Sequence, residues 1–165
     1  QVWWSVRPHH RFGTVEVRIC DAQTEAWQSL AISSLTVGLI AHLGHLFDEG
    51  MALPILETRY IEENLWRAIR FGLDGKLVDW AVGEEVAATD SLRRLVELAA
   101  PYADANGLSP HLADVERILR DGNGAQRQTQ AHVEGASLRE VFARTVAEAH
   151  RGSIAQTAYA PGGQA

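Results

Sequence analysis

The stretch from Ala26 to Phe47 carries no Asp, Glu, Lys or Arg, and no other feature restricts the fold of this chain as strongly. A membrane-spanning helix needs about 20 predominantly apolar residues, so the stretch is long enough to be one. Polar side chains recur within it, however, among them Gln28, Ser34 and His42. We interpret it as a buried helix of a soluble protein, with a membrane span as the alternative. A helix that is apolar almost all round needs cover on more than one side.

Two segments before this helix are predicted strands. Thr14–Cys20 alternates between apolar and polar residues, which places Glu16 and Arg18 together on the polar face of one strand. A short aromatic strand at Val2–Val6 and a turn at Pro8–Gly13 would complete an antiparallel hairpin. Because two strands do not make a stable sheet alone, this hairpin must be covered by helices or joined by strands from elsewhere.

The rest of the chain carries the start and stop signals of helices. Asp21 or Thr24 is the predicted cap of the long apolar helix, and Asn123 is the predicted cap of a short later helix. Ser137 and Glu140 have the spacing of a capping box. The long apolar helix is predicted to end at about residue 47, and a second helix to span residues 58–71. Further helices are predicted to start near residue 90, at residue 109 and at about residue 125, and the last to run from residue 137 to about residue 150.

These elements predict an α+β fold in which a short antiparallel hairpin precedes a mainly α-helical bundle. The sequence pattern does not decide the conformation of residues 76–86, where a second short hairpin is possible. We expect one domain over residues 1–151 and a low-complexity tail over residues 152–165.

The composition excludes some classes of function. An apolar fraction of 46% and a charged fraction of 22% are typical of a globular protein. The net charge of −6 argues against a nucleic-acid-binding protein, which would carry a basic face. The single cysteine, Cys20, fits a cytoplasmic location and is expected to be a buried structural thiol. His42 and His45 share a helix face, but without a third ligand they are interpreted as core or interface histidines rather than as a zinc site.

The pair Glu16 and Arg18 is the first candidate for chemistry. A carboxylate can hold a hard divalent cation, and a guanidinium can make bidentate contacts with phosphate oxygens. The alternative is a solvated sheet face stabilised by charge pairs across strands, and spacing alone favours this alternative.

Three segments add to this evidence: RPHHRFGTVEVRICD at residues 7–21, ENLWRAIRFG at residues 63–72, and GNGAQRQ at residues 122–128. Together and in this order they resemble the motifs of the glutamate–cysteine ligase type 2 family, which are ATP-dependent carboxylate–amine ligases. The resemblance extends from Trp3 to about His150 and corresponds to the C-terminal half of the family's chain.

The resemblance implies a glutamine synthetase-like fold, in which a curved, mainly antiparallel sheet holds ATP and Mg²⁺ on its concave face. It also implies the substrates, which are glutamate and cysteine or a similar amine. ATP would phosphorylate the carboxylate, and the amine would displace phosphate from the acyl phosphate. The family's other metal-binding carboxylates lie in its N-terminal half, so this chain alone is expected to be inactive.

Matched residue by residue, the resemblance makes Glu16 a magnesium ligand and Arg18 the catalytic group that stabilises the transferring phosphoryl. It makes Arg11, Asn64 and Arg70 cofactor-binding residues. Asn64 and Arg70 are equally well explained as the polar face of a helix held by charge pairs.

Two further expectations concern less specific features. The helix that contains Asn64 should direct Ile61 and Leu65 toward the core. Arg127 is a weak candidate for a ligand contact, because a tight turn between helices also explains its motif.

A second hypothesis treats the chain as a non-catalytic helical domain that acts in oligomerisation or partner binding. The unpaired edge of the hairpin and the apolar long helix both invite association with another chain. We therefore expect a homo-oligomer, held by the hairpin, the long helix or both.

Overall fold

The computed structural model describes residues 5–156, with side chains described for residues 5–150. The helices are α1 (Ala26–Asp48), α2 (Thr58–Phe71), the 3-10 turn η1 (Gly72–Asp74), α3 (Ala88–Ala105), α4 (Ser109–Asp121), α5 (Gly124–Val133) and α6 (Leu138–Gln156). The strands are β1 (Val6–His9), β2 (Thr14–Val17), β3 (Lys76–Asp79) and β4 (Glu84–Ala87). The fold is therefore α+β, as the sequence predicted.

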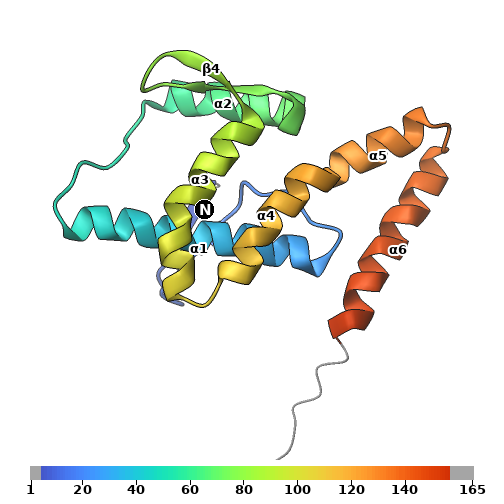
Figure 1. Ribbon diagram of the computed structural model, residues 1–165, viewed down its shortest axis with the longest axis horizontal. Helices are drawn as coiled ribbons and strands as arrows, with labels where there is room; N and C mark the ends of the chain where they lie inside the picture. The colour runs from blue at the N-terminus through green and yellow to red at the C-terminus, as the bar shows by residue number, and fades with distance from the viewer. Residues whose placement is uncertain (1–4, 157–165) are drawn as a thin grey trace, which may run out of the picture.

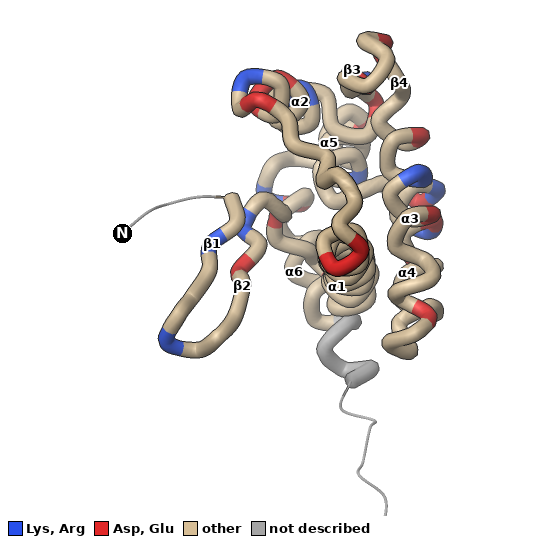
Figure 2. The backbone as a smooth tube through the Cα atoms, turned by 90° about the vertical axis from the view of Figure 1, so that its left-hand side faces the viewer, with Lys and Arg blue, Asp and Glu red and all other residues tan. Residues whose placement is uncertain are grey.

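The helices are arranged around α1. Figure 1 shows α3 and α4 crossing α1, with α2 and the β3–β4 hairpin at one end of α3 and the α5–α6 pair beyond α4. Seen along α1 in Figure 2, the β1–β2 hairpin stands on the side opposite to α3 and α4. The core is consequently built where α1, α3 and α4 meet.

Small residues let these helices approach closely. Ala31 of α1 and Ala99 and Ala103 of α3 have no exposed surface, and they pack with Leu112 and other apolar residues of α4. A Cβ atom placed on Gly38 would lie 2.8 Å from both the Cβ and the carbonyl oxygen of Ala99. The crossing of α1 and α3 therefore depends on the absence of a side chain at residue 38.

Helix α1 is buried on one face only. Its buried residues are Gln28, Ala31, Ser34 and Gly38, whereas a line of large apolar side chains is exposed: Leu30, Val37, Ile40, Leu43 and Phe47. By length and composition alone α1 could cross a membrane, and 17% of its most apolar window is buried. The interpretation of α1 as a buried helix is thus wrong, and the described residues leave uncovered the face that was expected to need a partner. This exposed line is named the outer face of α1 below.

The β1–β2 hairpin differs from its prediction in where it begins. The pairing runs from Val6 opposite Val17 to His9 opposite Thr14, so residues assigned to the turn are strand residues. Residues 1–4 of the predicted first strand lie outside the described residues. Strand β2 ends at Val17, although the backbone N–H of Arg18 still donates to the carbonyl of Ser5 at 2.7 Å.

The lone thiol is not where the sequence predicted. Cys20 is exposed, so its assignment as a buried structural thiol was wrong. The reason is that the chain leaves the sheet after β2 and runs over the surface toward α1.

The ambiguous stretch at residues 76–86 does form a hairpin, and α2 packs on it with its polar face. The side-chain amide of Asn64 donates to the carbonyl of Val78 at 2.9 Å and accepts from the N–H of Val78 at 2.8 Å. Ile61 and Leu65 are 53% and 38% exposed, so the expectation that they face the core was wrong. The two hydrogen bonds of the Asn64 amide orient the polar face of α2 toward the hairpin. The apolar side chains of Ile61 and Leu65 stay partly exposed because no described part of the chain covers them.

The helix caps match the sequence in part. Asn123 caps α5 by accepting from the N–H of Gln126 at 2.9 Å, and the N–H of Ser137 donates to Glu140 at 2.8 Å. The cap of α1 is Glu25, which forms a capping box with Gln28, and is neither Asp21 nor Thr24. The last helix continues to Gln156, beyond its predicted end.

Candidate functional site

The polar face of the β1–β2 hairpin carries a carboxylate between two guanidinium groups. Arg7 lies opposite Glu16 in the strand register, and its Nε and Nη2 atoms are 2.8 Å and 2.5 Å from Oε2 of that carboxylate. Nε of Arg18 is 3.7 Å from the other oxygen, Oε1. Sequence reasoning did not select Arg7, because only the register shows that it faces Glu16.

These residues do not make a magnesium site by themselves. Mg²⁺ takes about six oxygen ligands at close to octahedral geometry, usually one or two carboxylates with water and phosphate oxygens. Among residues 5–150, no group of three or more His, Cys, Asp or Glu side chains could hold a metal ion. Both oxygens of Glu16 face arginines in the structure. The assignment of Glu16 as a metal ligand stays a prediction that requires further carboxylates.

A large hollow is bordered by the residues that follow Arg18, although Arg7, Glu16 and Arg18 do not line it themselves. It has a volume of about 1230 Å³ and is lined by pieces of all three segments singled out in the sequence. The first segment contributes its end at Asp21, the second contributes Arg70 and its neighbours on α2, and the third contributes Asn123 and Arg127. Residues far apart in the chain therefore form one concave surface.

The predicted cofactor-binding residues occupy three different places. Arg70 lines the hollow, and its guanidinium lies 5.4 Å from the ring centroid of Phe71. Asn64 faces the β3–β4 hairpin, where both ends of its amide are used by the backbone of Val78. Arg11 is exposed at the turn between β1 and β2. Of the three, Arg70 is the one that borders the hollow.

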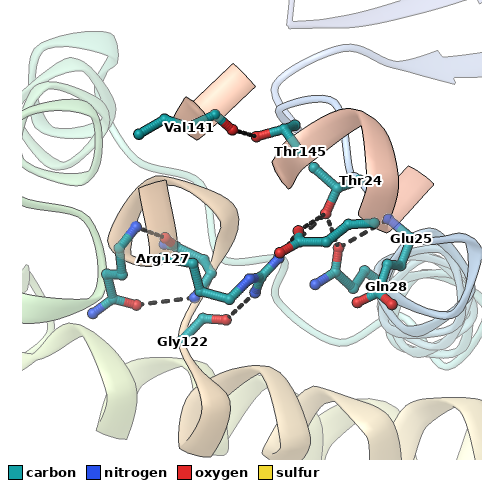
Figure 3. A network of polar contacts seen from close by, with 10 residues as sticks. Thr24, Glu25, Gln28, Gly122, Arg127, Val141 and Thr145 are labelled. Atoms are coloured by element: carbon teal, nitrogen blue, oxygen red, sulfur yellow. Dashed lines mark hydrogen bonds and ion pairs between the residues drawn. The ribbon is translucent and has the colours of Figure 1, made fainter. Parts of the chain in front are cut away.

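Arg127, which also lines the hollow, links the turn before α5 to the residues before α1 and to α6. Its Nη1 donates to the carbonyl of Gly122 at 2.6 Å, and its Nη2 donates to the hydroxyl of Thr24 at 3.2 Å and lies 3.6 Å from Glu148 of α6. Figure 3 shows this network, in which Thr24 also contacts Gln28 of α1. The guanidinium is thus engaged by the protein itself, which favours a structural role.

The loop before α5 is fixed by side-chain pairs. Gln126 donates to Asp74 of η1 at 2.7 Å, which joins α5 to the turn that follows the second segment. At the end of α4, the hydrogen bond from Arg120 holds the pKa of the Asp121 carboxyl below its ordinary value. Asp74 and Gln126 both line the hollow, so their hydrogen bond connects two parts of its wall.

Comparison with known proteins supports the family resemblance that the three motif segments indicated. The model of the glutamate-cysteine ligase family 2 matches residues 1–160. Proteins named "putative glutamate–cysteine ligase 2" from Solibacter usitatus and Gloeobacter violaceus are 33% and 37% identical to this chain, and one named "putative glutamate–cysteine ligase 2-1" from an Arthrobacter species is 35% identical. The matches cover 98%, 87% and 94% of the chain but 42%, 38% and 41% of these relatives. The chain thus spans about two-fifths of the length of the curated relatives that it matches.

Proposed function

Because this chain belongs to the glutamate-cysteine ligase family 2, we propose that it is part of an ATP-dependent ligase that joins the carboxylate of glutamate to the amine of cysteine or a similar compound. The reaction would pass through an acyl phosphate, in a cytoplasmic enzyme with a glutamine synthetase-like sheet. The observation that carries the proposal is the hollow, because pieces of all three motif segments line one concave surface.

The guanidinium groups of the hairpin suit the phosphoryl-transfer step. Arg7 and Arg18 have side chains that are 24% and 27% exposed, so both are partly shielded from water. Arginine pairs planar N–H donors with phosphate oxygens, and the contacts with Glu16 pre-organise both guanidinium groups for the charge that develops during transfer. We assign to Arg18 the stabilisation of that charge, and to Glu16 the role of holding both guanidinium groups in place.

The further metal ligands, which are not found among the described residues, are assigned to the part of the ligase outside the match. As a metal ligand, the role that the family resemblance implies, Glu16 would exchange one of its two arginine contacts for the metal ion. In the hollow, Arg70 is exposed and is the candidate for binding an anionic group of ATP or of the amino-acid substrates. The proposal therefore needs residues from outside the matched region to complete the active site.

A chimera tests the proposed function. This chain replaces the 162 matched residues of the Solibacter usitatus relative, and glutamate, cysteine, Mg²⁺ and ATP are supplied. We expect the chimera to release ADP and form the amide, measured by a coupled assay and by mass spectrometry, and we expect the isolated chain to do neither. In the chimera, Arg18→Ala should lower kcat roughly 100-fold or more, because it removes a donor to the transition state.

The matched control is Arg59→Ala, since Arg59 is exposed and pairs locally with Glu57. This variant should keep the activity of the chimera. Turnover by the isolated chain that disappears on Glu16→Ala would contradict the proposal, as would a well-folded chimera without activity.

Self-association is a second candidate function, and the outer face of α1 favours it. Apolar side chains along that face are 40–71% exposed, and the hairpin adds Val15 at 59%. We propose that the isolated chain forms a homodimer through the outer face of α1, the hairpin or both, which would remove this surface from water.

Light scattering at micromolar concentration checks the homodimer. Ile40→Glu, at a position that is 52% exposed, should shift the mass toward the monomer. Val82→Glu is the control, because Val82 is 67% exposed in the turn between β3 and β4. A wild-type chain that stays monomeric would refute the self-association.

A further inference from the structure

Helix α2 has the opposite orientation from an ordinary amphipathic surface helix. Its polar side chains are used inward, since Asn64 binds Val78 and Arg67 binds Glu85 of β4 at 2.7 Å. Its apolar residues, at the spacing of one helix face, lie on a face other than the one that contacts the β3–β4 hairpin and are partly exposed. Ile61, Leu65 and Ile69 are 53%, 38% and 77% exposed.

This stripe forms part of the hollow. Leu65 and Ile69 line it from α2, and Ile19, which is 59% exposed, lines it from the segment after β2. Figure 2 shows α2 and the β1–β2 hairpin to the same side of the α3–α4 pair. The three side chains Ile19, Leu65 and Ile69 are called the apolar wall below.

The shape of the hollow decides which partner it fits. A two-fold symmetric dimer needs a surface that is complementary to itself, and a concave surface does not fit against its own copy. A convex apolar element from a different polypeptide does fit it. The two hairpins, each a separate two-stranded sheet among the described residues, also leave strand edges open for pairing.

We propose that the apolar wall is the docking site for the part of the ligase that this chain does not match. The inference rests on the proposed function, and the length of the relatives supports it, because more than half of each relative lies outside the match. The partner is thus a polypeptide with an apolar convex surface and a free strand edge. Its docking would close the hollow and bring its own side chains next to Arg70.

Binding of two separate polypeptides tests the docking site. The partner is the part of the Solibacter usitatus relative outside the match, expressed alone, and binding is measured by calorimetry. Wild-type chain is expected to bind, and Ile69→Glu to weaken binding roughly tenfold or more, because the contact would bury an unpaired carboxylate. Val82→Glu adds the same charge at an exposed position outside the apolar wall and should bind like the wild type. Circular dichroism checks that the piece of the relative and both variants fold before binding is measured.

Each other outcome overturns the docking site. Equal binding by the wild type and Ile69→Glu would place the contact elsewhere, and absence of wild-type binding would remove it. A homodimer abolished by Ile69→Glu would make a second copy the occupant. Activity of the chimera is a separate readout, so an inactive chimera with Ile69-dependent binding would reject the function and keep the docking site.

Discussion

Replacing Gly38 with Ala is expected to destabilise the protein relative to the same replacement at Gly44. Both glycines lie in α1, where alanine is more favourable than glycine by about 1 kcal/mol. At residue 44 a Cβ would meet no heavy atom within 4 Å, so Gly44→Ala should keep this gain. At residue 38 the Cβ would lie 2.8 Å from Ala99, and α1 and α3 would have to separate.

The difference between the two variants isolates the crossing of α1 and α3. Overpacking a well-packed core costs about 1–3 kcal/mol, so the free energies of unfolding of the two variants should differ by that amount. Denaturant unfolding followed by circular dichroism measures it. Equal stability of the two variants would mean that the helices do not touch at Ala99.

Removing the Arg127 side chain is expected to release the α5–α6 pair from α1. Arg127→Ala deletes the donors to Gly122 and Thr24 and leaves Glu148 without its cation. Hydrogen bonds that involve a charged group contribute about 1.5–3 kcal/mol, so we expect a loss of about 2–3 kcal/mol for this partly buried network. Relative to the wild type, the backbone amides of α5 and α6 should exchange hydrogen faster in Arg127→Ala, whereas those of α3 and α4 should change less.

The control for this prediction is Arg120→Ala. Arg120 is exposed and pairs with its neighbour Asp121, and surface pairs of this kind contribute about 0–1 kcal/mol. If both substitutions changed stability equally, Arg127 would not join the helices. A loss of stability that is uniform over all helices would also contradict the local role.

The sequence by itself determined the element types and the family. Alternation predicted a strand at the segment containing Glu16, and cap signals placed Asn123 and Ser137 at helix starts. These features are local, since a cap or an alternating strand depends on residues a few positions apart. The three motif segments indicated the family, which the comparison confirmed.

The tertiary structure alone decided which face of each element is covered. Periodicity shows that Ile61 and Leu65 share a helix face, but it does not show whether the chain can cover that face. In α2 the hydrogen bonds of Asn64 to Val78 turned the polar face inward and left the apolar stripe outside. In the same way, the register alone paired Arg7 with Glu16. Burial depends on contacts between residues distant in sequence, and a local pattern carries no information about them.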